Sequence, residues 1–107
     1  MEKIIIFQRN VQIFLEDLVD ILFEKEYFGF KEDAKIYVNE IVQYVNHHNF
    51  ETGIKKTPDS HKKFGKYYLK YKANNRTFWY IFFDRKENRF LVNHILNNHS
   101  KNFTELL

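Results

Sequence analysis

The feature that most constrains the fold of this chain is a change in hydrophobic periodicity near residue 66. Before this point, apolar side chains recur every three or four residues over two stretches that are each long enough for a helix. After it, apolar and polar residues alternate, as in a strand with one buried face. The pattern predicts a single α+β domain spanning residues 1–107, with the helices and the main part of the sheet in separate segments.

The first of the two helical stretches follows a short apolar segment, Ile4–Phe7, which is predicted to be a strand. The helix is expected to begin at Val11, with Asn10 as its N-cap, and to end near residues 27–29. One face is apolar and the other carries most of the acidic residues. The apolar positions are Val11, Phe14, Leu15, Leu18, Ile21 and Leu22.

The second helical stretch has Glu32 and Asp33 in its first turn, where carboxylates favour the positive end of the helix dipole. It is expected to end within residues 47–49. Only a few residues, including Gly29, separate the two helices, so an antiparallel hairpin with a shared buried face is predicted. The apolar stripe consists of Ala34, Tyr37, Val38, Ile41, Val42 and Val45.

The second half of the chain predicts an antiparallel three-strand meander. Its strands are expected at residues 66–73, 76–84 and 89–96, and its turns at residues 74–75 and 86–88. The middle strand is apolar on both sides, which is typical of a central strand. Residues 50–64 have no stable period and are predicted to be a basic loop, either solvated or used for binding.

Composition narrows the class of protein. Twenty aromatic residues against three Gly and one Pro favour a packed domain, and the absence of Cys excludes disulfides, thiolate zinc sites and a cysteine nucleophile. The longest apolar runs are far shorter than a membrane span, and no secretory signal is visible, so a soluble cytoplasmic protein without membrane partners is expected.

Charge is distributed unevenly along the chain. Residues 1–50 hold five Lys or Arg against nine Asp or Glu, a balance of −4, whereas residues 51–107 hold twelve against five, a balance of +7. This asymmetry indicates either a C-terminal half that faces a polyanion or an ordinary solvated surface.

A row of alternate residues in the first strand of the meander is the main candidate for a binding face. Lys66, Lys70 and Lys72 would supply positive charge to a phosphate backbone, and Tyr68 could stack on a base. Arg76 or Arg89 could hold a phosphate through two hydrogen bonds. The alternative is an exposed sheet face that lysines keep soluble.

Two histidines near the end of the last strand are candidates for proton transfer. His99 follows the strand in a polar tail, whereas His94 alternates with Phe90, Val92 and Leu96 and is expected to share their face, so a place in the core is its alternative. The adjacent pair at residues 47–48 lacks the spacing of a metal site, and no phosphate loop, dinucleotide motif or nucleophile elbow is present. No metal or cofactor is therefore expected.

The order of elements and the segment from Phe64 to Phe83 (FGKYYLKYKANNRTFWYIFF) resemble the RelE/ParE superfamily of bacterial type II toxin–antitoxin modules. The resemblance covers nearly the whole chain. It implies a toxin whose RelE-like relatives cut mRNA in the ribosomal A site, or whose ParE-like relatives inhibit DNA gyrase by protein binding. An orphan copy that has lost toxicity is the third alternative.

The resemblance also implies roles for individual residues. Lys70 and Lys72 match the basic pair that binds phosphate, and Arg76 matches the arginine that stabilises the phosphorane. His99 falls where cutting relatives carry an arginine or histidine, and is the candidate general acid. The aromatic residue that is often Tyr in active relatives is here Phe103, which has no hydroxyl group. An acidic or amphipathic antitoxin is the implied partner.

Overall fold

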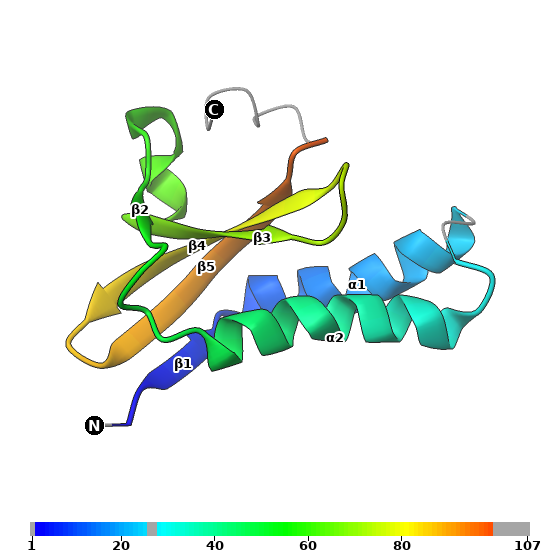
Figure 1. The fold of residues 1–107 in the computed structure, drawn as a ribbon, viewed down its shortest axis with the longest axis horizontal. Coiled ribbons are helices and arrows are strands. Elements are labelled where there is room, and N and C mark those ends of the chain that lie inside the picture. The colour runs from blue at the N-terminus through cyan, green and yellow to red at the C-terminus, as the bar shows by residue number, and fades with distance from the viewer. Residues whose placement is uncertain (1, 26–27, 100–107) are drawn as a thin grey trace.

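The computed structural model describes residues 2–25 and 28–99 and shows an α+β fold in which a helix pair covers one face of a five-stranded mixed sheet (Figure 1). The strand order is β1-β5-β4-β3-β2. The bounds are β1 Ile4–Phe7, α1 Arg9–Glu24, α2 Lys31–His47, β2 Lys55–Lys56, the 3₁₀ helix η1 Asp59–Phe64, β3 Tyr67–Lys72, β4 Phe78–Lys86 and β5 Arg89–Asn97. None of the described helices is long and apolar enough to cross a membrane.

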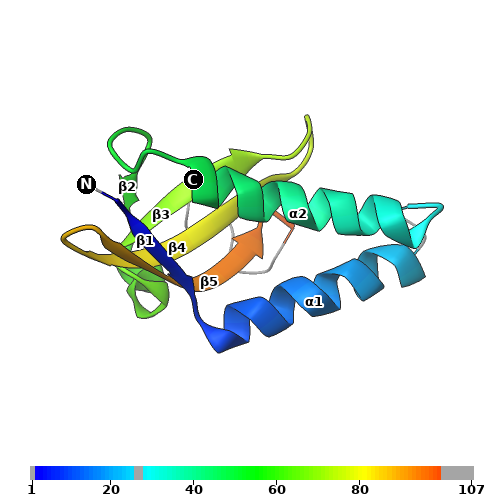
Figure 2. The ribbon, with the colours of Figure 1, turned by 90° about the horizontal axis from the view of Figure 1, so that it is seen from below.

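The helix hairpin matches the sequence prediction apart from its ends. Helix α1 begins at Arg9, because the carbonyl oxygen of Gln8 accepts the first turn's N–H groups, so Asn10 lies inside the helix and the N-cap prediction is wrong. Helix α1 ends at Glu24, earlier than expected, and α2 begins with Glu32 and Asp33 in its first turn as predicted. Figure 2 shows both helices lying across the same face of the sheet.

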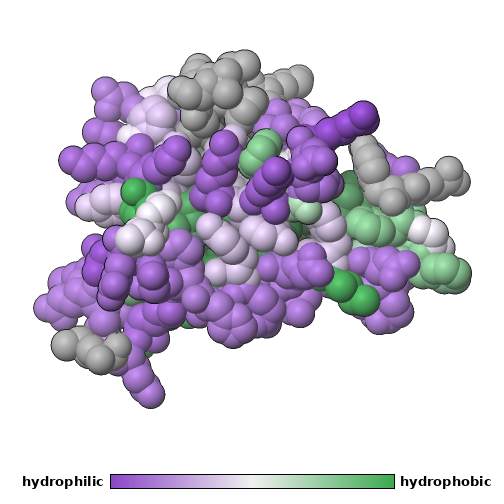
Figure 3. Space-filling view, in the orientation of Figure 1, coloured by the Kyte–Doolittle hydropathy of each residue, from purple (hydrophilic) through white to green (hydrophobic). Residues whose placement is uncertain are grey.

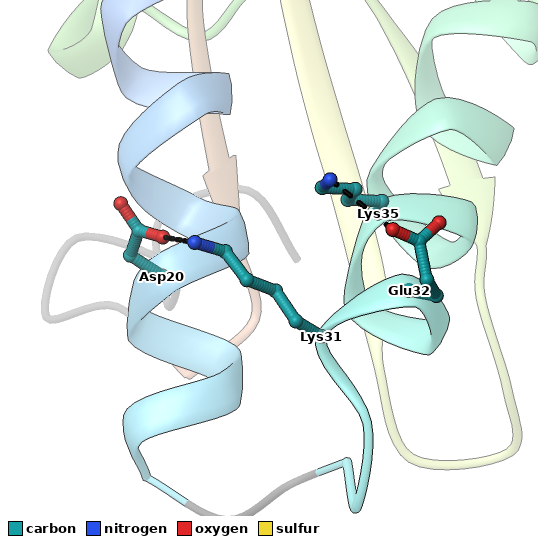
Figure 4. A network of polar contacts seen from close by, with 4 residues as sticks. All are labelled: Asp20, Lys31, Glu32 and Lys35. Atoms are coloured by element: carbon teal, nitrogen blue, oxygen red, sulfur yellow. Dashed lines mark hydrogen bonds and ion pairs between the residues drawn. The ribbon is translucent and has the colours of Figure 1, made fainter.

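Among the described residues, two ion pairs accompany the hairpin near its connecting turn (Figure 4). Lys31 of α2 reaches Asp20 of α1 at 3.1 Å, and Lys35 lies 3.2 Å from Glu32 within α2. All four side chains are more than half exposed, so each pair stabilises the fold by at most about 1 kcal/mol. The apolar stripes of the two helices, not these pairs, hold the hairpin on the sheet.

The sheet has five strands rather than the predicted three. Strand β1 pairs in parallel with β5, from Ile4 opposite Arg89 to Phe7 opposite Val92, and extends the meander at one edge. The two-residue strand β2, within the segment predicted to be a loop, pairs with β3 at the other edge. Both additions depend on pairing between distant segments, which a local periodicity does not encode.

A bulge at Asn93 divides β5 between the two faces of the sheet. Phe83 of β4 pairs with Val92, but the preceding residue Phe82 pairs with His94, so one residue of β5 is unpaired. Before the bulge Val92 faces the helices, and beyond it His94 faces the opposite side with Phe82. The expectation that His94 shares a face with Val92 is therefore wrong. The side chain of Asn93 donates to Asp84 Oδ2 at 2.9 Å.

The main core lies between the helices and the sheet, and a second aromatic cluster lies on the other face. Tyr68, Tyr80, Phe82 and Leu96 are buried there, and Phe64 of η1 packs over them. Figure 1 shows η1 on the side of the sheet away from the helices. Tyr68 is only 6% exposed, so the face predicted to be basic is an aromatic cluster with lysines at its rim.

Candidate functional site

The end of the sheet that carries the β3–β4 turn brings together the residues with the strongest potential for phosphate chemistry. We call this region the turn end: residues 73–77 of the turn and residues 97–99 at the end of β5. The turn closes through the Ala73 N–H, which donates to the carbonyl oxygen of Thr77 at 3.0 Å. The Asn74 carboxamide oxygen accepts from the Arg76 N–H at 2.8 Å, which fixes the backbone that carries the Arg76 side chain.

Asn98 joins the end of β5 to this turn. Its Nδ2 donates to the carbonyl oxygen of Arg76 at 2.9 Å, and its Oδ1 accepts from the Phe78 N–H at 3.1 Å. Because one side chain satisfies a donor and an acceptor on the neighbouring strand, the two segments keep a defined register. From the sequence, Asn98 was assigned only to a polar tail. The pair Asn97 and Asn98, directly before His99, was the sequence signal that could have identified this residue.

His99 is held beside Thr77. Its Nε2 lies 3.4 Å from Thr77 Oγ1, and its backbone N–H donates to Asn97 Oδ1 at 2.9 Å. The side chain is exposed, so a substrate can reach the ring. Arg76 is also exposed, one residue before Thr77. The two predicted catalytic residues therefore belong to one hydrogen-bonded end of the sheet.

A cleft of about 650 Å³ opens between this end of the sheet and the hairpin. Its floor is Trp79, whose Nε1 donates to the Tyr37 hydroxyl oxygen at 2.9 Å. Its size suits a small ligand or part of a polymer. The remaining lining residues are Leu18, Ile21, Leu22, Lys25 and Phe28 from the hairpin, and Asn74, Thr77, Asn97 and His99 from the turn end.

Lys70 and Lys72 lie close to the turn end but on the other face of the sheet. Lys72 pairs with Phe78 at the first position of β4, and Lys70 Nζ lies 4.4 Å from the centre of the Phe78 ring. The ammonium group of Lys70 is attracted to the ring and remains exposed. An anionic strand that crosses the sheet edge at this point would meet lysines on one face and His99 on the other.

The other predicted phosphate ligands do not join this site. Arg89 begins β5, so a nine-residue strand, roughly 25 Å long, separates it from the turn end. Lys66 precedes β3 at that same far end, and its N–H donates to Asp84 Oδ1. Tyr68 is buried and offers no open ring for a base. The predicted basic row is therefore split into two separate regions.

His94 is a structural residue of the second aromatic cluster. Its ring stacks on Phe64, with the ring centres 3.9 Å apart and the planes 10° from parallel. Burial lowers the pKa of His94 from its ordinary value of 6.5, and electrostatic interaction with Lys63 and His61 lowers this pKa further. The neutral form of His94 is thus placed to hold η1 against the sheet.

Lowering the pH is expected to destabilise the fold through His94. A histidine whose folded pKa lies below 6.5 binds protons more readily when unfolded, so stability is constant above about pH 6.5 and falls as the pH drops through that value. His48, whose pKa is lowered by burial and by Lys3, acts in the same direction. Thermal unfolding measured from pH 7.5 to 5.0 gives the slope of stability against pH. His94→Phe retains the stack and should flatten it; an unchanged slope would contradict this assignment.

Within residues 2–25 and 28–99, no three His, Asp or Glu side chains are grouped closely enough to hold a metal ion. Phe103 lies outside the described residues. Comparisons with family models, curated proteins and solved structures find no match to this chain.

Proposed function

We propose that this protein is the toxin of a bacterial type II toxin–antitoxin module, and that it cleaves mRNA on the ribosome in the cytoplasm. The observation that carries the proposal is the turn end, where Asn98 and Thr77 hold the segments bearing Arg76 and His99 side by side. A guanidinium and an imidazole at one exposed edge are two of the groups that RNA cleavage through the 2′-hydroxyl requires.

The proposed reaction uses the RNA's own 2′-hydroxyl as the nucleophile. The 2′-oxygen forms a bond to the adjacent phosphorus, and the bond to the 5′-oxygen of the next nucleotide breaks. The Arg76 guanidinium would bind the phosphate oxygens and stabilise the charge of the phosphorane. His99 would donate a proton to the leaving 5′-oxygen. The proton of the 2′-hydroxyl would pass to solvent water, which reaches the exposed turn end.

Lys70 and Lys72 would position the RNA strand beside this pair. Both side chains are exposed, and phosphate contacts from lysines give affinity that does not depend on base sequence. The same positive surface is the expected target of an acidic antitoxin, which would block access to the turn end.

Inhibition of DNA gyrase by protein binding is the second candidate, favoured by apolar surface at the connecting end of the hairpin. Figure 3 shows hydrophobic side chains gathered there. Phe30 is 74% exposed, and Ile21 and Phe23 are 43% and 39% exposed. Exposed apolar groups of this kind mark protein contact surfaces.

Two assays run in parallel separate these candidates. If the protein is an mRNA nuclease, adding it to a cell-free translation reaction should stop synthesis and shorten the reporter mRNA, while DNA supercoiling by purified gyrase is unaffected. If it is a gyrase inhibitor, supercoiling should stop and the mRNA should stay intact. No effect in either assay would contradict both candidates and leave an inactive relative.

A further inference from the structure

Strand β1 is an edge strand whose outer side pairs with no other strand among residues 2–25 and 28–99. Its inner side is bonded to the rest of the sheet: the Ile4 N–H donates to the carbonyl oxygen of Asn88 at 2.8 Å, and the Gln8 N–H to that of Val92 at 3.0 Å. Backbone groups of successive residues point to opposite sides of a strand, so the N–H and carbonyl groups of Ile5 point away from β5. Figure 1 shows β1, in dark blue, at the lower margin of the molecule. Such an edge is a template for another strand.

The features that usually protect an edge strand are missing from β1. Natural edges carry proline, lysine or a bulge that prevents pairing. Residues 4–7 are three isoleucines and a phenylalanine, and the register of β1 on β5 is regular. The preceding Lys3 points to the helix side, where its Nζ donates to the carbonyl oxygen of His48. Gln12 Nε2 donates to the Phe7 carbonyl oxygen at 2.7 Å, but that oxygen has a second lone pair. The edge is therefore open to pairing.

Two apolar side chains of this short strand are exposed. Ile5 and Phe7 pack against the main core, so Ile4 and Ile6 lie on the opposite face of the sheet. Ile4 is 46% exposed and Ile6 is 50% exposed. Burying both beside a partner strand would be favourable.

Two copies of β1 complement each other when they run antiparallel. A two-fold axis at Ile5 sets Ile4 of one copy opposite Ile6 of the other, on the same face of the sheet. The outward backbone groups of the two Ile5 residues then bond to each other in both directions. A register shifted by one residue sets residues of opposite faces against each other. A register shifted by two sets Lys3 opposite Arg9, which places two like charges together.

Charges at the ends of the strand favour the same register. It places Glu2 of one copy opposite Gln8 of the other, next to Arg9 and the first turn of α1. That turn holds no acidic residue of its own, and the positive end of a helix dipole favours a carboxylate. Glu2 and Arg9 are both exposed. A second copy of this chain therefore supplies a charge that complements each end of β1.

We propose that β1 pairs antiparallel with β1 of a second copy, joining two five-stranded sheets into one continuous sheet. The helices of both copies lie on the same side of this sheet, because the two-fold axis is perpendicular to it. Strand β1 pairs with residues 89–92 of β5, whereas the part of the turn end on that strand begins at residue 97. The dimer surface is thus separate from the turn end and does not depend on the proposed function.

The first test measures the mass of the full-length protein by sedimentation over a range of concentrations. A monomer–dimer equilibrium is expected. The double variant Ile4→Lys/Ile6→Lys should raise the dissociation constant by about tenfold or more. The control Ile13→Lys/Ile36→Lys removes two isoleucines that are 42% and 56% exposed on the helices, and should dimerise as the wild type does. Circular dichroism checks that both variants are folded. A wild type that is monomeric at every concentration, or equal weakening in both variants, would overturn the proposal.

A charge exchange tests the contact between Glu2 and Arg9. Glu2→Lys and Arg9→Glu should each weaken the dimer several-fold, because each places like charges together. The double variant Glu2→Lys/Arg9→Glu should recover most of the affinity. If it dimerises no better than the single variants, the proposed register is wrong.

Engineered disulfides test the register directly, because the chain has no Cys of its own. Positions 4 and 6 of opposite copies form a non-hydrogen-bonded pair, whose Cα atoms lie about 4.5 Å apart and within reach of a disulfide. Mild oxidation of a mixture of Ile4→Cys and Ile6→Cys should give a cross-linked dimer. Either variant alone should give much less, because its two thiols lie on a diagonal with Cα atoms about 7–8 Å apart. Equal cross-linking in a mixture of Ile13→Cys and Ile36→Cys would contradict the β1 interface.

Discussion

Replacing His99 with Ala should lower the rate of ribosome-dependent mRNA cleavage by roughly 10²- to 10⁴-fold, the usual contribution of a positioned general acid. The imidazole is exposed and fills no core position, so its removal should not alter the melting temperature. The variant should still bind RNA, because Lys70, Lys72 and Arg76 are unchanged. Single-turnover cleavage on programmed ribosomes and circular dichroism give the two readouts.

The matched control is His47→Ala. His47 is an exposed histidine in the last turn of α2, away from the turn end, so its replacement should leave the cleavage rate unchanged. If His99→Ala cuts as fast as the wild type, His99 has no part in the reaction. If both variants lose activity equally, the effect does not arise from proton transfer at the turn end.

Gly65→Ala should cause a large loss of stability, although it adds only one methyl group. Gly65 has φ of +146°, and an added Cβ would lie 2.9 Å from the carbonyl oxygen of Phe83 and 3.0 Å from its backbone nitrogen and carbonyl carbon. Backbone atoms of a central strand cannot move aside as a flexible side chain can. The free energy of unfolding should fall by about 2–4 kcal/mol, measured by urea denaturation.

Gly29→Ala is the control for this effect. Gly29 lies between the two helices, and a Cβ built there meets no atom within 4 Å. Its unfolding free energy should remain within about 0.5 kcal/mol of the wild-type value. Equal stability of the two variants would show that the backbone at Phe83 can move away from residue 65 at little cost.

The helices could be predicted from the sequence because their information is local. The stripes that include Leu15, Leu18, Ile41 and Val45 repeat with the helical period, and all four side chains are buried against the sheet. The alternation in β3 was equally informative for one face, since it predicts one buried face and Leu69 lies in the main core. It was misleading for the other face, because no local signal indicates that Phe64 of η1 returns to cover Tyr68.

The pairing of distant strands could not be predicted. The parallel contact of Ile5 with Phe90, and the β2 contact of Lys55 with Tyr68, each join segments whose own sequences are compatible with several partners. The bulge at Asn93 depends on side-chain bonds to Gln8, Asn10 and Asp84, which only the folded chain brings together.

The candidate site could be predicted only in part, because it too depends on contacts between distant strands. Arg76 and His99 were selected by residue type and resemblance, and the structure places both at the turn end. Lys66 and Arg89 were grouped with them because a strand was treated as one surface, whereas the length of β5 separates its two ends. Thr77 and Asn98 act through partners on a neighbouring strand, which a linear pattern does not reveal.

Primer-extension mapping on a defined mRNA decides whether this protein cuts RNA on the ribosome. Purified protein is added in parallel to naked mRNA and to ribosomes programmed with the same message, and wild type is compared with His99→Ala and His47→Ala. We expect new cuts at the ribosomal A site in the programmed sample, retained in His47→Ala and lost in His99→Ala. An mRNA left intact in both samples by the wild-type protein would contradict the assignment of this chain as an mRNA nuclease.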